Sequence, residues 1–434
     1  MVEYSNEGIG RLKSVLKLSF LYKGFNILLS FLLVRFTIQY AGDEIYGLWV
    51  TILAFLSWFS VIESGVSNSF RNKITSYFSE KNYEAIKLQI AMAYKSLSVI
   101  YFALAAILVL VIYSTSFHTL FQSASIINSR YALAISVIIY FLYFILHYLN
   151  NVFLATHQAE KTYLFLLIQN TVVLLTLIGL NYSSIEASLN LICIIYTLGP
   201  LITWLLLNVV AFKRLLKKLQ PSYKHFQQSG NIFKKLNPSF FVLQLFTLLI
   251  YSTDNIIILN FLNGVEVAKY NVAFKYFNII TVLFNLILVP YWAIFSEAFY
   301  KKDKSSIVYS INRLLRNWGA MLGIAVLLVI SSPFAYSIWI GKTMDISITL
   351  SLLMAISSLF TSWFNIFGYY LKSSNQLRLQ TRLLVFAGIL NIPLSILLIG
   401  FFNSEGVILA TIISTLPLVI ALPWQYKRSL KNIV

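Results

Sequence analysis

Long apolar stretches recur along the whole chain, and they constrain its fold more than any other feature of the sequence. Each runs for about 20 residues, the length at which an α-helix crosses roughly 30 Å of hydrocarbon. Strands of a membrane barrel would be half as long and would alternate apolar with polar residues, and these stretches do neither. Composition agrees, because 59% of the residues are hydrophobic and only 11% are charged. The sequence therefore predicts an all-α integral membrane protein.

Twelve membrane-spanning helices are predicted. A basic segment with Arg11, Lys13 and Lys17 precedes the first helix, which lacks a small-residue cleavage site, so we expect a retained helix and not a removed signal peptide. The predicted spans run approximately over Ser19–Tyr40, Tyr46–Ser67, Met92–Tyr113, Tyr131–Leu154, Tyr163–Asn181, Leu189–Phe212, Ser239–Leu262, Tyr270–Ile294, Trp318–Trp339, Ser347–Leu371, Leu383–Phe402 and Gly406–Tyr426.

The basic residues predict the topology, because Lys and Arg accumulate in cytoplasmic loops. With the amino end inside, 26 of the 33 basic residues fall on inner segments, and only Arg130, Lys269 and Lys342 fall on outer ones. Both termini are therefore expected in the cytoplasm. The same distribution explains the net charge of +18 without a nucleic-acid partner, because the basic residues are spread over every inner loop and not gathered on one face.

Several kinds of chemistry are not expected from this sequence. Its single cysteine, Cys193, excludes a disulfide within the chain and a cysteine metal site, and its four histidines form no ligand pattern. No Gly-rich phosphate loop is present, so ATP is not expected as the energy source. We expect neither a cofactor nor an enzymatic activity.

An internal repeat divides the chain into halves. The segment FSEKNYEAIK (Phe78–Lys87) matches FSEAFYKKDK (Phe295–Lys304) at an offset of 217 residues, half of the 434. AGDEIYGLWV, which contains Gly42, matches NGVEVAKYNV, which contains Gly264, and LIGLNYSSIEA matches LIGFFNSEGVILA. These matches reach an offset of 223 residues, and each lies at the same place in its half. Duplication of a six-helix unit is the prediction.

The repeat predicts two pseudo-symmetric six-helix lobes, residues 1–212 and 239–434, joined by a basic cytoplasmic linker, residues 213–238. Six spans per half give both lobes the same orientation, related by an axis along the membrane normal. Such lobes would meet along a cleft that opens to either side of the membrane by rocking. For the linker we favour a segment lying on anionic headgroups over a specific docking role.

The segment from Tyr40 to Ile74, YAGDEIYGLWVTILAFLSWFSVIESGVSNSFRNKI, resembles the first outer turn and second span of bacterial polysaccharide-repeat exporters. In these proteins an L-G-x-x-x-[YF]-G-like turn precedes an acidic residue and a Gly; here Ala41 and Glu63 replace the commoner Leu and Asp. The chain is thus similar to Wzx-type O-antigen flippases of the multidrug, oligosaccharidyl-lipid and polysaccharide exporter (MOP) superfamily, whose fold is V-shaped. This resemblance implies a carrier in the bacterial inner membrane that moves a polyprenyl-diphosphate-linked oligosaccharide to the outer leaflet.

Charged residues within the predicted spans are the candidate site. Counting at about 1.5 Å per residue from Gly264 places Asp254 and Lys275 at one level, roughly 15 Å deep, on adjacent helices. They either neutralise each other or serve transport, because intramembrane charges often mark pathways. Arg35 lies nearer the outer face, where it either extends to the headgroups or lines the cavity. At the inner mouth, Lys23 and Glu63 are predicted to pair or to extend to the surface.

The sign of these charges favours an anionic substrate. Among the residues placed deep in the membrane, Asp254 is the single acid, whereas Lys275 and Arg35 are two bases. A diphosphate needs Lys and Arg donors in a low-dielectric site. We therefore predict Arg35, Lys275 and, at the inner mouth, Lys23 as substrate-binding residues. A cation-coupled multidrug exporter of the same fold would instead require surplus carboxylates.

The resemblance also implies a coupling-ion site, because related flippases hold Na⁺ with an acidic residue on span seven and polar groups on spans eleven and twelve. Asp254, Asn391 and Thr411 stand on those spans. For Asn391 and Thr411 we favour plain hydrogen bonding between helices, and a proton on Asp254 is an alternative to Na⁺. Likewise, His147 with Asn150 and Asn151 could line the cleft or bond between helices, and we favour the latter.

The expected partners are the lipid-linked oligosaccharide, membrane lipids, and polysaccharide polymerase with other assembly proteins. A scaffold for glycan assembly that moves no lipid is a third interpretation, which binding to assembly enzymes without transport would reveal. The sugars of the substrate are not predicted, because their recognition depends on hydrogen-bond geometry.

Overall fold

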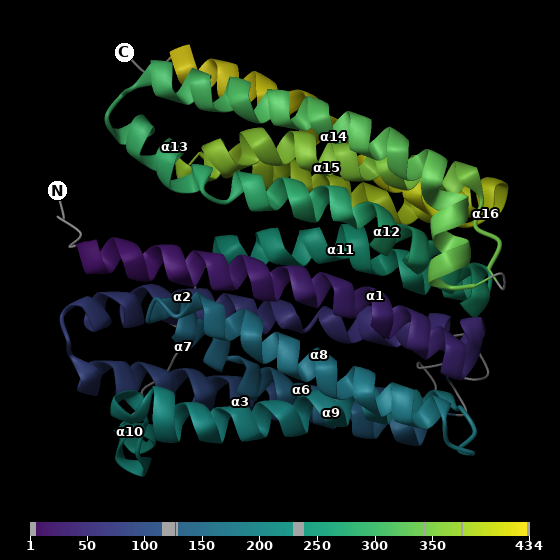
Figure 1. Cartoon of the computed structure of the whole chain (residues 1–434), viewed down its shortest axis with the longest axis horizontal. Helices are drawn as coiled ribbons and strands as arrows, with labels where there is room; N and C mark the ends of the chain where they lie inside the picture. Colours follow the sequence, from purple (N-terminus) through teal and green to yellow (C-terminus); the bar gives the residue numbers. More distant parts are fainter. Residues whose placement is uncertain are drawn as a thin grey trace. The chain divides into compact units, whose positions relative to one another are not determined.

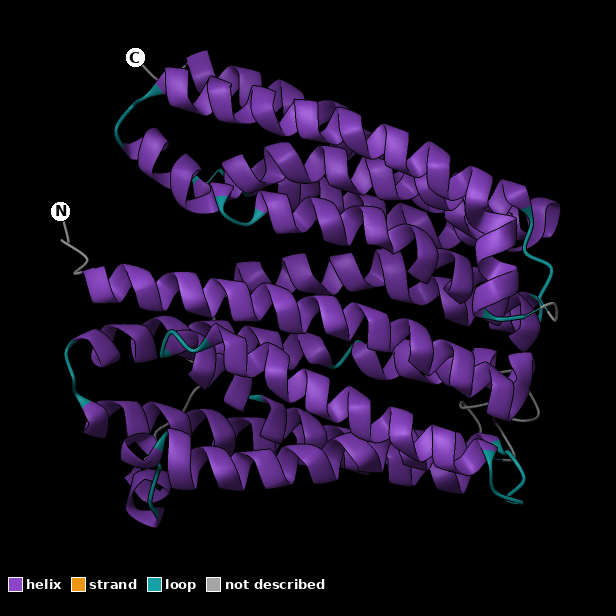
Figure 2. Ribbon diagram, viewed as in Figure 1, coloured by secondary structure: helices purple, strands orange, loops and turns teal. Residues whose placement is uncertain are grey.

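The computed structural model describes residues 6–114, 126, 129–228, 238–341, 344–374 and 376–431. Every regular element in these ranges is helical (Figure 2). Nine helical segments within the described ranges are long and apolar enough to cross a membrane. The chain is thus an all-α protein with multiple membrane-spanning helices.

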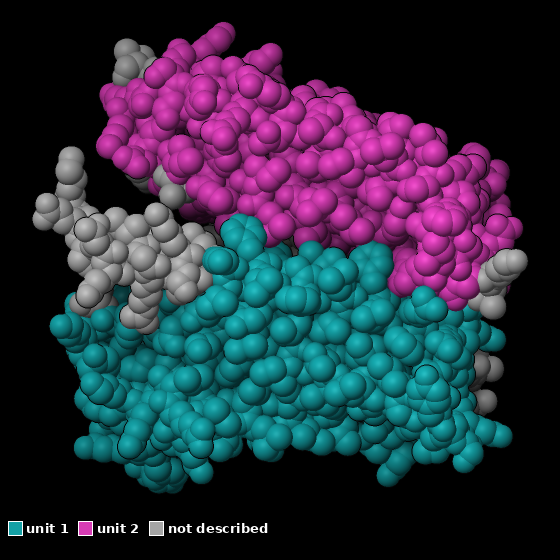
Figure 3. Space-filling model, in the orientation of Figure 1, with its two compact units in different colours: residues 1–45, 56–241 teal, residues 46–55, 242–434 magenta. Residues whose placement is uncertain are grey.

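The chain folds into two compact units, each of which is described by itself (Figure 3). Unit 1 comprises residues 1–45 and 56–241, and unit 2 comprises residues 46–55 and 242–434. The second predicted span is therefore shared, since its first ten residues, Tyr46–Phe55, pack with the carboxyl-terminal half of the chain.

Within unit 1 the helices run side by side (Figure 1). Its elements are most of α1 (Asn6–Ser57), then α2 (Ser60–Ser79), α3 (Tyr83–Tyr113), α6 (Arg130–His147), α7 (Leu149–Ala155), α8 (Ala159–Asn181) and α9 (Leu189–Val210), followed by a π-helical turn (Ala211–Leu215), a 3₁₀ turn (Lys217–Leu219) and α10 (Tyr223–Gln228).

Besides Tyr46–Phe55 of α1, the described part of unit 2 contains five long helices and one short one. They are α11 (Pro238–Phe261), α12 (Gly264–Leu288), α13 (Tyr291–Tyr300), α14 (Lys304–Trp339), α15 (Ile348–Ser373) and α16 (Arg378–Lys431). The first residues of α11, up to Phe241, belong to unit 1.

Two of the helices contain a sharp break where the sequence predicts a turn between spans. In α1 the break is at Gly42, whose φ of 80° suits a residue without a Cβ. In α16 it is at Asn403, with φ of 50°, and Asn tolerates this left-handed region better than most residues. A Cβ at Gly406, just beyond, would lie 2.3 Å from the carbonyl oxygen of Leu398, so the tight reversal requires glycine there.

The turns α2–α3 and α13–α14 have the same local structure, and they correct the predicted register of the repeat. In the first, Lys81 adopts φ of 56° and the side chain of Asn82 accepts a hydrogen bond from the Ala85 amide. In the second, Lys302 adopts φ of 57° and Asp303 caps the next helix in the same way. Equivalent residues are thus 221 positions apart, so the offset of 217 is wrong by one helical turn. The corrected offset of 221 lies within two residues of the offsets of the outer turns, 222 and 223.

Large apolar side chains cover the outside of both units. Leu110 is 72% exposed in unit 1, and Ile330 and Phe401 are 73% and 74% exposed in unit 2. Polar side chains instead concentrate inside, where residues such as Thr197 and Asn391 are fully buried. This arrangement reverses that of a water-soluble protein and suits helices surrounded by lipid, because exposed apolar patches of this extent require an apolar environment.

The segment Tyr46–Phe55 is fastened to α11 and α12 within unit 2. The Tyr46 hydroxyl donates to Asn271 Oδ1 at 2.7 Å, and the Thr51 hydroxyl donates to the Asn255 carbonyl at 3.4 Å. A Cβ at Gly47 would lie only 1.7 Å from the carbonyl oxygen of Gly264. Backbone therefore meets backbone at this crossing, as small residues permit between membrane helices.

The described part of the predicted linker, up to Gln228, docks on α3. His225 Nε2 lies 3.0 Å from Glu84 Oε2, and Lys95 donates to the Phe226 carbonyl at 3.3 Å. Lys218 Nζ lies 5.8 Å from the centre of the Tyr83 ring. This part of the linker therefore packs against α3, and its predicted position on anionic headgroups stays a prediction.

Candidate functional site

Asp254 is the buried acid of unit 2. It is 2% exposed on α11, and its Oδ2 accepts a hydrogen bond of 2.5 Å from the Tyr270 hydroxyl of α12. Its other carboxylate oxygen, Oδ1, is buried and has no hydrogen-bond partner among the described residues. A carboxylate buried in a membrane helix is costly without compensation, so this free oxygen favours a bound cation or proton.

Lys275 lies half-buried on α12 and is not the partner of Asp254. None of the ion pairs found among the described residues includes Lys275. The interpretation that Asp254 and Lys275 neutralise each other is therefore wrong. Five residues separate Tyr270 from Lys275 along α12, a rotation of about 140° around the helix, so only Tyr270 faces Asp254. The positive charge of Lys275 is not neutralised by a described acid.

Asn391 and Thr411 lie together in the two segments of α16. The Asn391 amide donates to Thr411 Oγ1 at 3.0 Å and to Ser414 Oγ at 3.5 Å. These contacts are the hydrogen bonds between helices that the sequence favours. Asn391 Oδ1 and Ser395 Oγ are buried without partners in the described part of unit 2. The cluster thus offers free oxygen atoms, the ligand type of hard cations, while no described contact joins Asp254 to it.

In unit 1, the two predicted substrate-binding residues lie on α1. Arg35 is exposed, and Lys23 is half-buried with its Nζ 6.0 Å from the centre of the Tyr163 ring. Lys23 does not pair with Glu63, because Glu63 is 7% exposed and faces α6 and α7 instead. Both predictions for Glu63, the ion pair with Lys23 and extension to the surface, are wrong.

Glu63 belongs to a buried polar cluster. Its Oε2 lies 3.3 Å from His147 Nδ1, and its Oε1 accepts a hydrogen bond of 3.2 Å from the Asn151 amide. His147 Nε2 lies 2.7 Å from the amide nitrogen of Asn150. The prediction of bonding between helices is confirmed for His147 and Asn151, which both contact Glu63, whereas the contact of Asn150 with His147 lies within one predicted span. That Glu63 is their partner could not be read from the spacing, since these residues come from distant parts of the chain.

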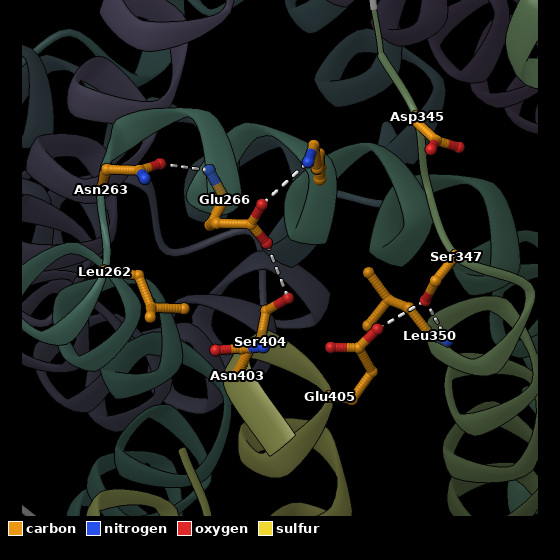
Figure 4. Close-up of a pocket in the computed structure, with 10 residues that line it drawn as sticks. Leu262, Asn263, Glu266, Asp345, Ser347, Leu350, Asn403, Ser404 and Glu405 are labelled. Carbon is orange, nitrogen blue, oxygen red and sulfur yellow. Dashed lines mark hydrogen bonds and ion pairs between the residues drawn. The ribbon is translucent and has the colours of Figure 1, made fainter. Parts of the chain in front are cut away.

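A polar cavity of about 380 Å³ lies at the end of unit 2 that carries the α11–α12 turn (Figure 4). Glu266 occupies its centre, where Lys269 and Ser404 contact its two carboxylate oxygens at 2.8 and 3.0 Å. Ser347, at the start of α15, donates to Glu405 at 2.5 Å. These contacts tie α12, α15 and the break in α16 together.

Across the described chain, no group of three or more His, Cys, Asp or Glu residues is arranged to hold a metal ion.

Solved structures share this fold. An inward-facing multidrug resistance MATE family transporter of the MOP superfamily matches with a TM-score of 0.70 at 9% identity, over 95% of this chain and 99% of that one. The lipid II flippase MurJ in an inward closed conformation matches with a TM-score of 0.64 at 15% identity, over 96% of this chain and 89% of that one. The chain therefore has the fold of MOP-superfamily transporters.

In sequence, the chain is similar to a protein of Salmonella typhi named "Putative O-antigen transporter", with 21% identity over 362 residues, 80% of this chain and 79% of that protein. No family model matches the sequence. The predicted resemblance to the O-antigen branch of the MOP superfamily is confirmed by this relative and by the shared fold.

Proposed function

We propose that the chain is a flippase that moves a polyprenyl-diphosphate-linked oligosaccharide from the cytoplasmic to the periplasmic leaflet by alternating access. The observation that carries this proposal is Lys275. It is half-buried within a membrane helix, and the acid expected to neutralise it is hydrogen-bonded to Tyr270. A cation held in a low-dielectric setting attracts a diphosphate strongly. The similarity to a putative O-antigen transporter and the fold shared with a lipid II flippase support the same substrate class.

Arg35 and Lys23 have supporting roles in this proposal. Arg35 is exposed on α1, so its guanidinium is accessible to a diphosphate, which it matches bidentately. Lys23 lies over Tyr163, an arrangement that keeps its charge beside an aromatic face rather than beside a carboxylate. None of the ion pairs found among the described residues includes Lys23, which suits attraction of an anionic headgroup.

Transport is coupled to an ion in this proposal, with Asp254, Asn391 and Thr411 as the candidate residues. The free Oδ1 atoms of Asp254 and Asn391 support binding of Na⁺, and the burial of Asp254 equally supports a proton. A transport rate that responds to neither a Na⁺ nor a pH gradient would contradict both versions.

The finer organisation belongs to the same proposal. The chain would cross a bacterial inner membrane twelve times with both termini in the cytoplasm, in lobes of residues 1–212 and 239–434 joined by residues 213–238. Polysaccharide polymerase and other assembly proteins would be its partners, receiving the lipid-linked unit at the outer leaflet. The protein would be a carrier and not an enzyme.

A cation-coupled multidrug exporter is the second candidate function. It is favoured by Glu63, which the depth count placed at the surface and which is in fact buried at 7% exposure. A buried carboxylate near aromatic rings suits a hydrophobic cation. The fold shared with a multidrug transporter is compatible with this function.

Binding by native mass spectrometry distinguishes the two. We expect the purified chain to retain a polyprenyl-diphosphate oligosaccharide and not a hydrophobic cation, because Lys275 carries an unneutralised charge. Lys275→Gln should weaken retention about tenfold or more, the effect of losing one charge-assisted contact. Lys224→Gln is the matched control, because Lys224 is exposed on α10. Retention of the hydrophobic cation alone would show that the chain is a multidrug exporter and not a flippase.

A further inference from the structure

The polar cavity of unit 2 forms where three turns meet (Figure 4). It lies between the α11–α12 turn, the segment that leads into α15 and the break in α16. All three segments are predicted outer turns, because they follow the predicted spans seven, nine and eleven. The residues proposed above for the diphosphate and the coupling ion do not line the cavity. Its chemistry indicates a different kind of ligand.

One wall of the cavity is held in place by hydrogen bonds. Glu266, in the first turn of α12, contacts Lys269 Nζ at 2.8 Å and accepts a hydrogen bond of 3.0 Å from the Ser404 hydroxyl. Asn263 caps the same helix, because its Oδ1 accepts from the Glu266 amide at 2.9 Å. These contacts join the α11–α12 turn to the break in α16. The wall is therefore formed before a ligand arrives, so little ordering is needed on binding.

Other polar groups of the cavity are available to a ligand. Asp345 and Asn403 are exposed, and Figure 4 marks no contact from either of them to another of the residues drawn. In the described part of unit 2, Glu405 uses only Oε1, which accepts from Ser347 at 2.5 Å, and the Asn263 side chain uses only its oxygen. The second oxygen of Glu405 and the amide nitrogen of Asn263 remain. The available groups thus combine carboxylates, which accept, with carboxamides, which donate as well.

This mixture of groups fits an uncharged ligand that is rich in hydroxyl groups. Among the described residues that line the cavity are three carboxylates and one lysine, which together repel an anion such as a diphosphate. A cation would satisfy the carboxylates but leave the carboxamide and lysine donors without acceptors. Each hydroxyl of a saccharide both donates and accepts, so carboxylates bind its hydrogens while carboxamides and lysine bind its oxygens.

We propose that this cavity binds an uncharged saccharide, with Asp345, Glu405 and Asn403 as the residues that contact its hydroxyl groups. Its volume of about 380 Å³ lies within the range of roughly 300–1,000 Å³ of small-molecule sites. Leu262 and Leu350 add apolar lining, which suits the C–H groups of a sugar ring. The cavity holds the sugar part of the lipid-linked oligosaccharide on the outer side of the membrane, a role that rests on the proposed function.

Saturation-transfer NMR of the purified chain in lipid nanodiscs tests the site with free sugars: glucose, galactose, N-acetylglucosamine, N-acetylgalactosamine and glucuronic acid. We expect at least one of the four uncharged sugars to bind, and glucuronic acid not to bind, because its carboxylate is repelled. Asp345→Ala should weaken binding about tenfold or more, since it removes a charged acceptor. Asn403→Gly keeps the left-handed turn but removes the carboxamide, and should weaken binding about fivefold.

Glu186→Gln is the matched control, because Glu186 is exposed in unit 1 and does not line the cavity, so sugar binding should be unchanged. Asp345→Asn removes one negative charge but keeps a polar group, and it should increase the binding of glucuronic acid relative to the uncharged sugars.

Leaflet movement of the lipid-linked oligosaccharide, measured separately, distinguishes this site from the proposed function. Sugar binding in a chain that moves no lipid would contradict the function and leave the site intact. The site itself would be overturned if none of the uncharged sugars bound, if glucuronic acid bound more tightly than they did, or if Asp345→Ala and Asn403→Gly bound them as well as the wild type.

Discussion

At the scale of single residues, the hydrogen bond between Tyr270 and Asp254 determines which charged side chains of unit 2 can bind a substrate or an ion. It occupies one oxygen of a fully enclosed carboxylate and leaves Lys275 outside the contact. The same bond is the only described interaction that compensates the burial of Asp254. Removing this bond should therefore lower the free energy of unfolding.

Tyr270→Phe removes the hydroxyl and leaves the ring. We expect a loss of about 1–3 kcal/mol in the free energy of unfolding, because a buried acceptor then lacks its donor. Denaturant unfolding in detergent measures it. Tyr40→Phe is the control, because the Tyr40 hydroxyl donates to the Ile185 carbonyl in an exposed position, where water replaces the lost bond. Equal stability of the two variants would show that the Tyr270 bond contributes little.

Residue contacts were the least predictable level of this structure. Counting along helices gives the depth of a side chain but not its direction around the helix. Asp254 and Lys275 were placed at one depth, yet Tyr270 and not Lys275 faces Asp254. Glu63 and Lys23 were both placed at the inner mouth, yet Glu63 faces His147. The contact between Asn391 and Thr411 was easier to predict, because polar side chains on neighbouring membrane helices commonly form hydrogen bonds with each other.

At the scale of elements, the crossing of Gly47 over Gly264 is the tightest described contact of Tyr46–Phe55. We expect Gly47→Ala to destabilise the protein by about 1–3 kcal/mol, because the new methyl group overlaps backbone that cannot move aside easily. Thermal unfolding measures the effect.

Gly24→Ala is the control in the same helix, since a Cβ at Gly24 has nothing within 4 Å. That substitution should be neutral or slightly stabilising, because alanine has the higher helix propensity. If Gly47→Ala unfolds at the same temperature as Gly24→Ala, the close approach of the two backbones is not present in the folded protein.

The two equivalent turns α2–α3 and α13–α14 differ in the charge of their cap, Asn82 in one and Asp303 in the other. Hydrogen bonds from the Ser305 hydroxyl and the Ser306 amide hold the pKa of Asp303 below its ordinary value. Because the folded pKa is the lower one, the stabilisation is complete above the ordinary pKa of Asp and is lost as the pH falls through the folded value.

Asp303→Asn should therefore match the wild type in thermal stability at neutral pH and show a smaller loss on acidification, as expected for a neutral cap such as Asn82. Asp303→Ala should already be less stable at neutral pH, since it removes the acceptor altogether. A series of melting curves over acidic and neutral pH measures both effects. An unchanged acid sensitivity in Asp303→Asn would argue against this cap as its source.

Elements were far more predictable than contacts. The apolar stretches predicted an all-helical membrane protein, and nine helical segments of the described chain are long and apolar enough to span a membrane. The breaks at Gly42 in α1 and Asn403 in α16 lie where outer turns were predicted. The repeat was misaligned by four residues because Phe, Ser and Lys recur so often in this composition that a chance match exceeded the true one. Only the caps Asn82 and Asp303, which differ in identity, show the correct register.

At the scale of the whole molecule, fold and substrate rest on different evidence. The fold is shared with multidrug transporters and with a lipid II flippase over almost the full chain. Because one fold serves both kinds of cargo, it does not select the substrate. In our proposal the charge within the membrane helices selects the substrate, and Lys275 is the residue that attracts an anionic headgroup.

The decisive measurement is leaflet movement of a labelled polyprenyl-diphosphate oligosaccharide in liposomes that contain the purified chain. We expect the wild type and the exposed control Lys224→Glu to move the lipid, and Lys275→Glu to remain folded but lose at least about 90% of the rate, because charge reversal repels the diphosphate. Normal movement by Lys275→Glu, or uptake of hydrophobic cations with no lipid movement by the wild type, would contradict the proposed function.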